Sequence, residues 1–109
     1  ELKHGTLALV DESTLSVFII CQPETANKCL SAVHEVLCRG GRAAVLTSVP
    51  EAAEELGKYL PVWKLPKVSP RLAPFLSAAA LQRVAYLTAV RLGRNPDKPR
   101  NLAKSVTVE

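Results

Sequence analysis

The chain contains a nearly continuous apolar run at Ser16-Val17-Phe18-Ile19-Ile20-Cys21-Gln22, rich in β-branched residues. Such a run is typical of a parallel strand that is buried on both faces of its sheet. A helical pattern follows, opening at Pro23 and ending at the glycines Gly40 and Gly41. A second buried-strand pattern, Ala43-Ala44-Val45-Leu46-Thr47, comes next. Strand, helix and strand in this order predict a parallel β-α-β unit.

The sequence beyond this unit continues the alternation of strand and helix. We interpret Ser48 as the N-cap of a short helix, with Glu51 completing a capping box. Residues 60–65 predict a third strand, which its prolines confine to the start, end or edge of the sheet. Trp63, within this strand, is expected to anchor the core. Residues 72–92 predict a helix that is apolar on most sides, as in a helix buried between elements or under a partner subunit.

Together these patterns predict an α/β fold: a partial, doubly wound parallel sheet flanked by helices, with an irregular C-terminal tail. Three strands are few for such a sheet, since both of its faces need covering. We therefore interpret residues 1–96 as the C-terminal portion of a larger domain and residues 97–109 as a separate tail.

Charge is concentrated near the C-terminus. The net charge is +4, and residues 91–104 alone account for it, because they hold five basic residues and one acidic residue. A basic tail can face nucleic acid, an anionic membrane or a phosphorylated ligand, or it can simply be solvated. No aromatic residue lies between these charges to stack on bases, which argues against nucleic acid. The longest apolar stretch, residues 75–90, is interrupted by Gln82 and Arg83, which argues against a membrane span.

The cysteines indicate a reducing compartment. Cys21, Cys29 and Cys38 form an odd set with no close pair, which suits buried or half-buried structural thiols better than disulfides. No zinc site is expected, because there is no C-x-x-C motif and the two histidines are far apart. No signal-peptide pattern opens the sequence. These features predict a cytoplasmic protein without a metal.

Two end segments carry a resemblance to one enzyme family. They are Glu1-Leu2-Lys3-His4-Gly5-Thr6-Leu7-Ala8-Leu9-Val10-Asp11 and Pro99-Arg100-Asn101-Leu102-Ala103-Lys104-Ser105-Val106-Thr107-Val108-Glu109. The chain resembles the C-terminal part of the second sugar-isomerase (SIS) domain of glucosamine–fructose-6-phosphate aminotransferase (isomerising). The resemblance implies a Rossmann-like SIS domain in a homodimeric enzyme. Such an enzyme makes glucosamine 6-phosphate and glutamate from fructose 6-phosphate and glutamine, with no metal or organic cofactor.

Lys104 is the leading candidate for chemistry. An unprotonated amine can attack a ketose carbonyl to form a Schiff base, whereas most tail lysines are merely solvated. The resemblance implies that Lys104 forms this Schiff base with C2 of fructose 6-phosphate. It also implies that the backbone at Ala103 borders the sugar. The preceding tail residues Arg100, Asn101 and Leu102 would help to fold the tail over the site.

His4 is the second candidate. Histidine can move a proton between sugar oxygens near neutral pH, although a histidine near a chain end is more often an ordinary surface residue. The resemblance implies that His4, in Lys3-His4-Gly5, promotes opening of the sugar ring in the active site of the neighbouring subunit. Thr6 departs from the proline that the family motif usually has. His34 is expected to face solvent and receives no role.

The resemblance also implies that essential parts lie upstream of residue 1. These are the general-base glutamate, the Ser/Thr-rich phosphate loop, the other SIS domain and the glutaminase domain, so we expect the chain alone to be inactive. Two alternatives remain open at this point. One is an SIS-type glucosamine-6-phosphate deaminase, which would release ammonia without glutamine. The other is a non-catalytic module for sugar-phosphate sensing or dimerisation, with residues 72–92 as its dimer face.

Overall fold

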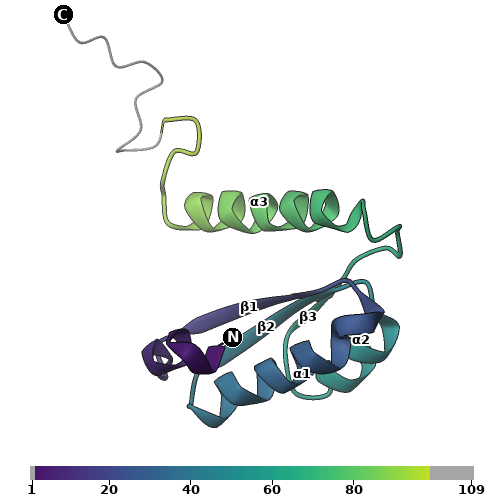
Figure 1. The fold of residues 1–109 in the computed structure, drawn as a ribbon. Helices are drawn as coiled ribbons and strands as arrows, with labels where there is room; N and C mark the ends of the chain where they lie inside the picture. Colours follow the sequence, from purple (N-terminus) through teal and green to yellow (C-terminus); the bar gives the residue numbers. More distant parts are fainter. Residues whose placement is uncertain (1, 99–109) are drawn as a thin grey trace, which may run out of the picture. The chain divides into compact units, whose positions relative to one another are not determined.

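The computed structural model describes residues 2–98, and Figure 1 shows the order of their helices and strands. The chain divides after Ser77 into two compact units, of which the first holds the sheet. The elements in chain order are the 3-10 helices η1 (Leu2–His4) and η2 (Thr6–Leu9), then β1 (Leu15–Ile20), α1 (Pro23–Cys38), β2 (Arg42–Thr47), α2 (Pro50–Leu56), β3 (Val62–Lys64) and α3 (Ala73–Arg91).

The sheet is parallel and its strands lie in the order β1-β2-β3, which confirms the predicted α/β fold. A helix connects each strand to the next, because parallel neighbours need a long crossover. Right-handed crossovers between consecutive strands place both helices on the same face of the sheet. Figure 1 accordingly shows α1 and α2 together on one side of the three strands.

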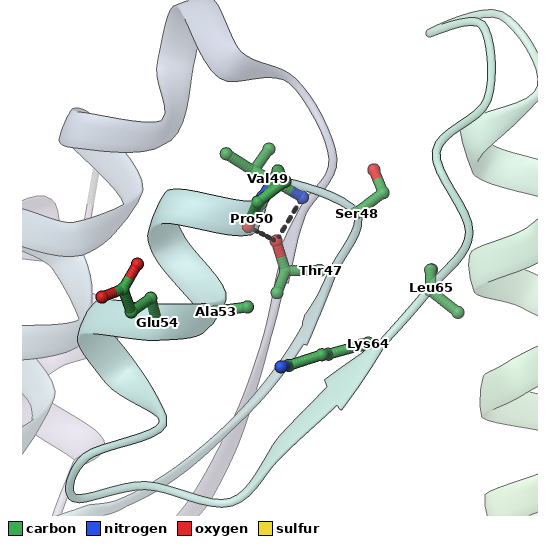
Figure 2. A pocket seen from close by; sticks show the side chains of 8 residues that line it. All are labelled: Thr47, Ser48, Val49, Pro50, Ala53, Glu54, Lys64 and Leu65. Atoms are coloured by element: carbon green, nitrogen blue, oxygen red, sulfur yellow. Dashed lines mark hydrogen bonds between the residues drawn. The ribbon is translucent and has the colours of Figure 1, made fainter.

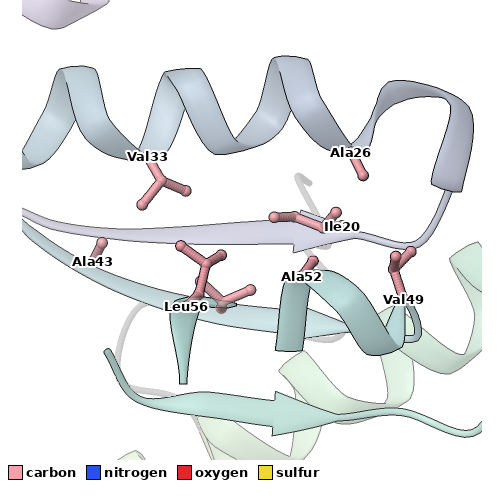
Figure 3. Packing of buried hydrophobic residues seen from close by; sticks show 8 residues of the cluster. Ile20, Ala26, Val33, Ala43, Val49, Ala52 and Leu56 are labelled. Atoms are coloured by element: carbon pink, nitrogen blue, oxygen red, sulfur yellow. The ribbon is translucent and has the colours of Figure 1, made fainter. Parts of the chain in front are cut away.

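The core lies between this face and the two helices. Phe18, Val45 and Val62 are register partners and therefore share one face of the sheet. Figure 3 shows apolar side chains from both helices meeting the strands here. The buried members of the cluster are Ile20, Ala26, Val33, Ala43, Val45, Val49, Ala52 and Leu56. Apolar burial of this kind is the main stabilising contribution to the first unit.

The opposite face of β1 differs from the prediction. Residues 43–47 of β2 are all buried, as expected, but Leu15, Val17 and Ile19 of β1 are 57%, 40% and 45% exposed. In the described part of the chain, α1 and α2 cover only the other face of this strand. The prediction that this strand is buried on both faces was therefore wrong for Leu15, Val17 and Ile19. The apolar run nevertheless predicted a strand correctly.

Two finer predictions were also wrong. The N-cap of α2 is Val49 and not Ser48, and no side chain among residues 2–98 caps this helix. Thr47 Oγ1 instead accepts a hydrogen bond from the Val49 amide at 3.0 Å. Trp63 is 43% exposed and not a core anchor. It pairs in register with Leu46, so it lies on the sheet face opposite to the core formed with α1 and α2.

α3 begins one residue later and ends one residue earlier than predicted. Its buried residues are Ala73 and Ser77, which both belong to the first unit. The Ser77 hydroxyl donates a hydrogen bond to the Ala73 carbonyl at 2.9 Å and lies 3.7 Å from the Cys21 thiol. Cover of residues 78–92 by other elements or by a partner subunit stays a prediction.

Thr47 fixes the end of β2 through its buried hydroxyl. This hydroxyl donates to the Ile20 carbonyl at 2.6 Å and accepts from the Val49 amide. We expect Thr47→Val to lower the free energy of unfolding by about 1–3 kcal/mol. Valine keeps the shape of threonine but leaves the Ile20 carbonyl and the Val49 amide without this hydrogen-bond partner. Urea unfolding of the purified protein measures this change. Thr88→Val is the matched control, since the Thr88 hydroxyl is exposed and donates to the Val84 carbonyl, its one partner in the part of the chain that the structure describes. Equal stability of Thr47→Val and wild type would contradict the prediction.

Candidate functional site

His4 lies at the end of η1, in an N-terminal segment that contributes nothing to the core. Neither η1 nor η2 contains a buried residue, and the His4 side chain is exposed. The segment is instead held against the α1–β2 part of the first unit by a small number of specific contacts. These contacts decide where His4 lies.

The contact nearest to His4 is an ion pair. The Lys3 Nζ atom lies 3.0 Å from Oε1 of Glu35, a residue in the C-terminal half of α1. Leu7 of η2 lies close by, because it lines with five α1-side residues an open pocket of about 440 Å³. The pocket is lined by Leu7, Ser31, His34, Glu35, Cys38 and Arg39. Both 3-10 helices are thus placed beside the outer surface of α1.

A second anchor follows η2. A Cβ atom built on the buried Gly41 would come 2.4 Å from Cγ1 of Val10 and 3.0 Å from Cγ1 of Val36. Only glycine leaves room here, so Val10 packs directly on the backbone that joins α1 to β2. The Arg42 amide also donates to the Thr14 carbonyl at 2.9 Å, which continues the attachment into β1.

The turn between η2 and β1 is built around Asp11. Its Oδ1 atom accepts hydrogen bonds from the Ser13 amide at 2.9 Å, the Ser13 hydroxyl at 2.7 Å and the Thr14 hydroxyl at 3.0 Å. These bonds, above all those of the Ser13 and Thr14 side chains, lower the pKa of the Asp11 carboxyl because they favour its charged form. The turn is therefore held in its present form when Asp11 is ionised.

The other predicted site residues are not placed by the structure. Lys104, Ala103, Arg100, Asn101 and Leu102 lie outside the described residues. Their roles, and any meeting of Lys104 with His4, stay predictions. His34 is exposed, as expected, and its Nε2 atom lies 3.1 Å from the Tyr59 hydroxyl.

One feature that was not predicted from the sequence is a hollow at the carboxyl ends of β2 and β3. It has a volume of about 370 Å³ and is lined by Thr47, Ser48, Val49, Pro50, Ala53, Glu54, Lys64 and Leu65. Figure 2 shows the Lys64 side chain reaching from β3 toward α2 across this space. Ligands of open α/β sheets bind beyond the carboxyl ends of the strands. The sequence could therefore have predicted a ligand-sized hollow where the strand patterns at residues 43–47 and 60–65 end.

Metal-binding clusters, cysteine pairs and membrane-spanning helices are absent from the described part of the chain. Residues 2–98 contain no group of three or more His, Cys, Asp or Glu side chains able to hold a metal ion. Cys21 and Cys29 are free and half-buried as predicted, whereas Cys38 is exposed, so the prediction was wrong for Cys38. None of the helices within residues 2–98 is both long and apolar enough to cross a bilayer.

The parallel β-α units define an α/β domain with a three-stranded sheet flanked by helices. No protein-family model matches the sequence. The chain is 44% identical over 109 residues to glutamine–fructose-6-phosphate aminotransferase (isomerising) of Pyrobaculum aerophilum. It is 46% identical over 110 residues to the enzyme of that name from Thermus thermophilus. Each alignment covers the whole chain and 18% of the relative.

A solved structure agrees with these relatives. The fold matches the C-terminal domain of glucosamine–fructose-6-phosphate aminotransferase from Francisella tularensis with a TM-score of 0.75 and 32% sequence identity. The match covers 87% of this chain and 27% of that chain. The chain is therefore homologous, along its whole length, to the C-terminal part of glucosamine–fructose-6-phosphate aminotransferase.

Proposed function

We propose that the chain is part of the sugar-isomerase half of an isomerising aminotransferase. That enzyme would make glucosamine 6-phosphate and glutamate from fructose 6-phosphate and glutamine. The observation that carries this proposal is the identity of 44–46% along the whole chain to enzymes of that name. Because the chain spans only 18% of those relatives, the reaction is assigned to the full-length protein and not to these residues alone.

The proposed roles follow the chemistry of the side chains. His4 would move a proton between the ring oxygen and the anomeric hydroxyl, which opens the cyclic sugar. The Lys104 amine would then attack C2 of the open ketose, releasing water and leaving a C=N bond. The backbone at Ala103 would border the sugar, while Arg100, Asn101 and Leu102 would fold the tail over it and exclude water. The isomerisation itself would use a glutamate from upstream of residue 1.

The proposed organisation agrees with these roles. Residues 1–96 would be the C-terminal portion of an SIS domain, and residues 97–109 would be its active-site tail. The partners would be fructose 6-phosphate, the upstream SIS and glutaminase domains, and a second copy of the full-length protein in a cytoplasmic homodimer. No organic cofactor is needed, because the lysine amine itself supplies the electrophilic imine. The chain alone would be inactive, since it lacks the glutamate and the phosphate loop.

Borohydride trapping tests the assignment of Lys104. Full-length protein is incubated with fructose 6-phosphate at neutral pH and reduced, which converts a C=N bond into a stable secondary amine. Peptide mass spectrometry is expected to find one sugar adduct, on Lys104. Lys98 is the internal control, because it lies six residues away in the same basic region and is assigned no role in the reaction. It is expected to carry no adduct.

The trapping experiment, combined with an assay of ammonia release from glucosamine 6-phosphate, separates the competing functions. An adduct on Lys104 with ammonia release from glucosamine 6-phosphate, and no dependence on glutamine, would indicate the deaminase instead. Binding of sugar phosphate without any adduct would indicate a sensing or assembly module. Trapping by the 109-residue chain itself would show that it already activates the lysine, which would contradict our expectation that the upstream half-domain is required.

A further inference from the structure

The segment that carries His4 is attached to the first unit at two points. Lys3 bonds Glu35 on one side of His4, and Val10 packs on Gly41 on the other side. Between these points η1 and η2 have no fully buried residue, and packing is limited to the half-buried Leu2 and Leu7. Among residues 2–98, Lys3–Glu35 is also the single ion pair. This ion pair is therefore the polar contact between the N-terminal segment and α1 that lies nearest to His4 in sequence.

Glu35 is the better-fixed member of the pair. Its side chain is 25% exposed, against 71% for Lys3. Glu35 lies on α1 between Val33 and Val36, which are 0% and 1% exposed and lock this stretch of the helix onto the sheet. A lysine on an exposed 3-10 turn samples many rotamers unless a partner selects among them. Glu35 thus restricts Lys3, and with it the backbone of the adjacent His4.

The second attachment cannot replace the first. Val10 and the Asp11 turn hold the chain after η2, and the intervening residues include Gly5 and the helix η2, which is exposed except for the half-buried Leu7. If the ion pair is broken, the partial packing of Leu2 and Leu7 and the C-terminal connection at Val10 are what still hold residues 2–9 on the first unit. His4 lies six residues from Val10, so its imidazole would then sample a wider region.

We propose that Glu35 is a positioning residue for His4: through its ion pair with Lys3, it holds the histidine where the imidazole meets the sugar ring oxygen. This inference rests on the proposed function of His4. The stability contribution of a partly exposed ion pair is small, so Glu35 is dispensable for folding. Catalysis is more sensitive, because a displacement of about 1 Å at a catalytic group can cost up to about 100-fold in rate.

The test compares two substrates in the full-length protein. Fructose 6-phosphate must be ring-opened, whereas 5-deoxyfructose 6-phosphate lacks the hydroxyl that closes the ring and is already open. We expect Glu35→Gln to lower kcat for fructose 6-phosphate by about two- to fivefold, the rate equivalent of one exposed ion pair. We expect no change of kcat for the open substrate. Glu55→Gln, an exposed α2 glutamate that forms no ion pair among residues 2–98, should leave both rates at the wild-type value.

A charge exchange completes the test. Lys3→Glu alone should slow only the ring-forming substrate, and Lys3→Glu combined with Glu35→Lys should restore its rate. Equal slowing of both substrates by Glu35→Gln, no slowing of either, or a double variant as slow as Lys3→Glu would each overturn the proposal. Failure of the proposed function itself looks different, because the wild-type protein would then convert neither substrate.

Discussion

Replacing Lys104 with alanine in the full-length protein is expected to abolish formation of glucosamine 6-phosphate and to leave glutamine hydrolysis intact. Alanine has no amine to attack C2, so the imine cannot form and every later sugar step is lost. Removal of a covalent nucleophile typically costs about 10³-fold or more in rate. Glutamine hydrolysis belongs to an upstream domain in this proposal and is measured in the same sample as glutamate release.

Two matched variants define the cause of that loss. Lys98→Ala removes a neighbouring basic residue and should retain sugar chemistry, because only Lys104 is assigned the imine. Lys104→Arg keeps the positive charge but presents a guanidinium that stays protonated, so it should be as inactive as alanine. Continued synthesis of glucosamine 6-phosphate by Lys104→Ala would refute the role of this lysine.

The arrangement of strands and helices was predictable because local and tertiary preferences agree in the centre of the chain. The apolar runs at 16–22 and 43–47 flank one amphipathic helix, and this pattern has few solutions other than a parallel β-α-β unit. The errors arose where a single residue was interpreted without its neighbours. Trp63 was assigned to the core by residue type, yet its register with Leu46 places it on the face away from α1 and α2.

The capping box failed for a related reason. Ser48 and Glu51 have the correct spacing, but Thr47 at the end of β2 supplies the hydroxyl that bonds the Val49 amide. Pro50 follows as the first helical residue and has no N–H to be capped. The hydroxyl that the capping box assigned to Ser48 is therefore supplied by Thr47, the last residue of β2.

Only parts of the candidate functional site could be predicted from the residues themselves. Nothing in the physical chemistry of the tail separates Lys104 from a solvated lysine, so the family resemblance alone carried that assignment. The ion pair between Lys3 and Glu35 joins residues 32 positions apart and leaves no local periodic signal. It becomes visible only once α1 and the N-terminal segment are placed beside each other in the first unit.

Replacing His4 with asparagine is expected to lower kcat/KM for fructose 6-phosphate by about 10²–10⁴-fold, the usual contribution of a general acid–base residue. Asparagine keeps the polarity and approximate reach of Nδ1 but cannot transfer a proton near neutral pH. Conversion of the open 5-deoxyfructose 6-phosphate should change far less, because this substrate needs no ring opening. The ratio of the two rates is the measurement, and equal losses on both substrates would contradict a role in ring opening.

Mixing variants then tests where His4 acts. If His4 serves the active site of the neighbouring subunit, a dimer of one His4→Asn chain and one Lys104→Ala chain contains one complete site, with Lys104 from the first chain and His4 from the second. Co-refolding of the two impaired variants should therefore restore part of the activity on fructose 6-phosphate. If His4 serves its own subunit, both sites of the mixed dimer are damaged, so mixed dimers without activity would contradict exchange between subunits. Recovery would also explain why an exposed histidine is held at two points of a segment that packs so little, since it must meet its substrate across an interface.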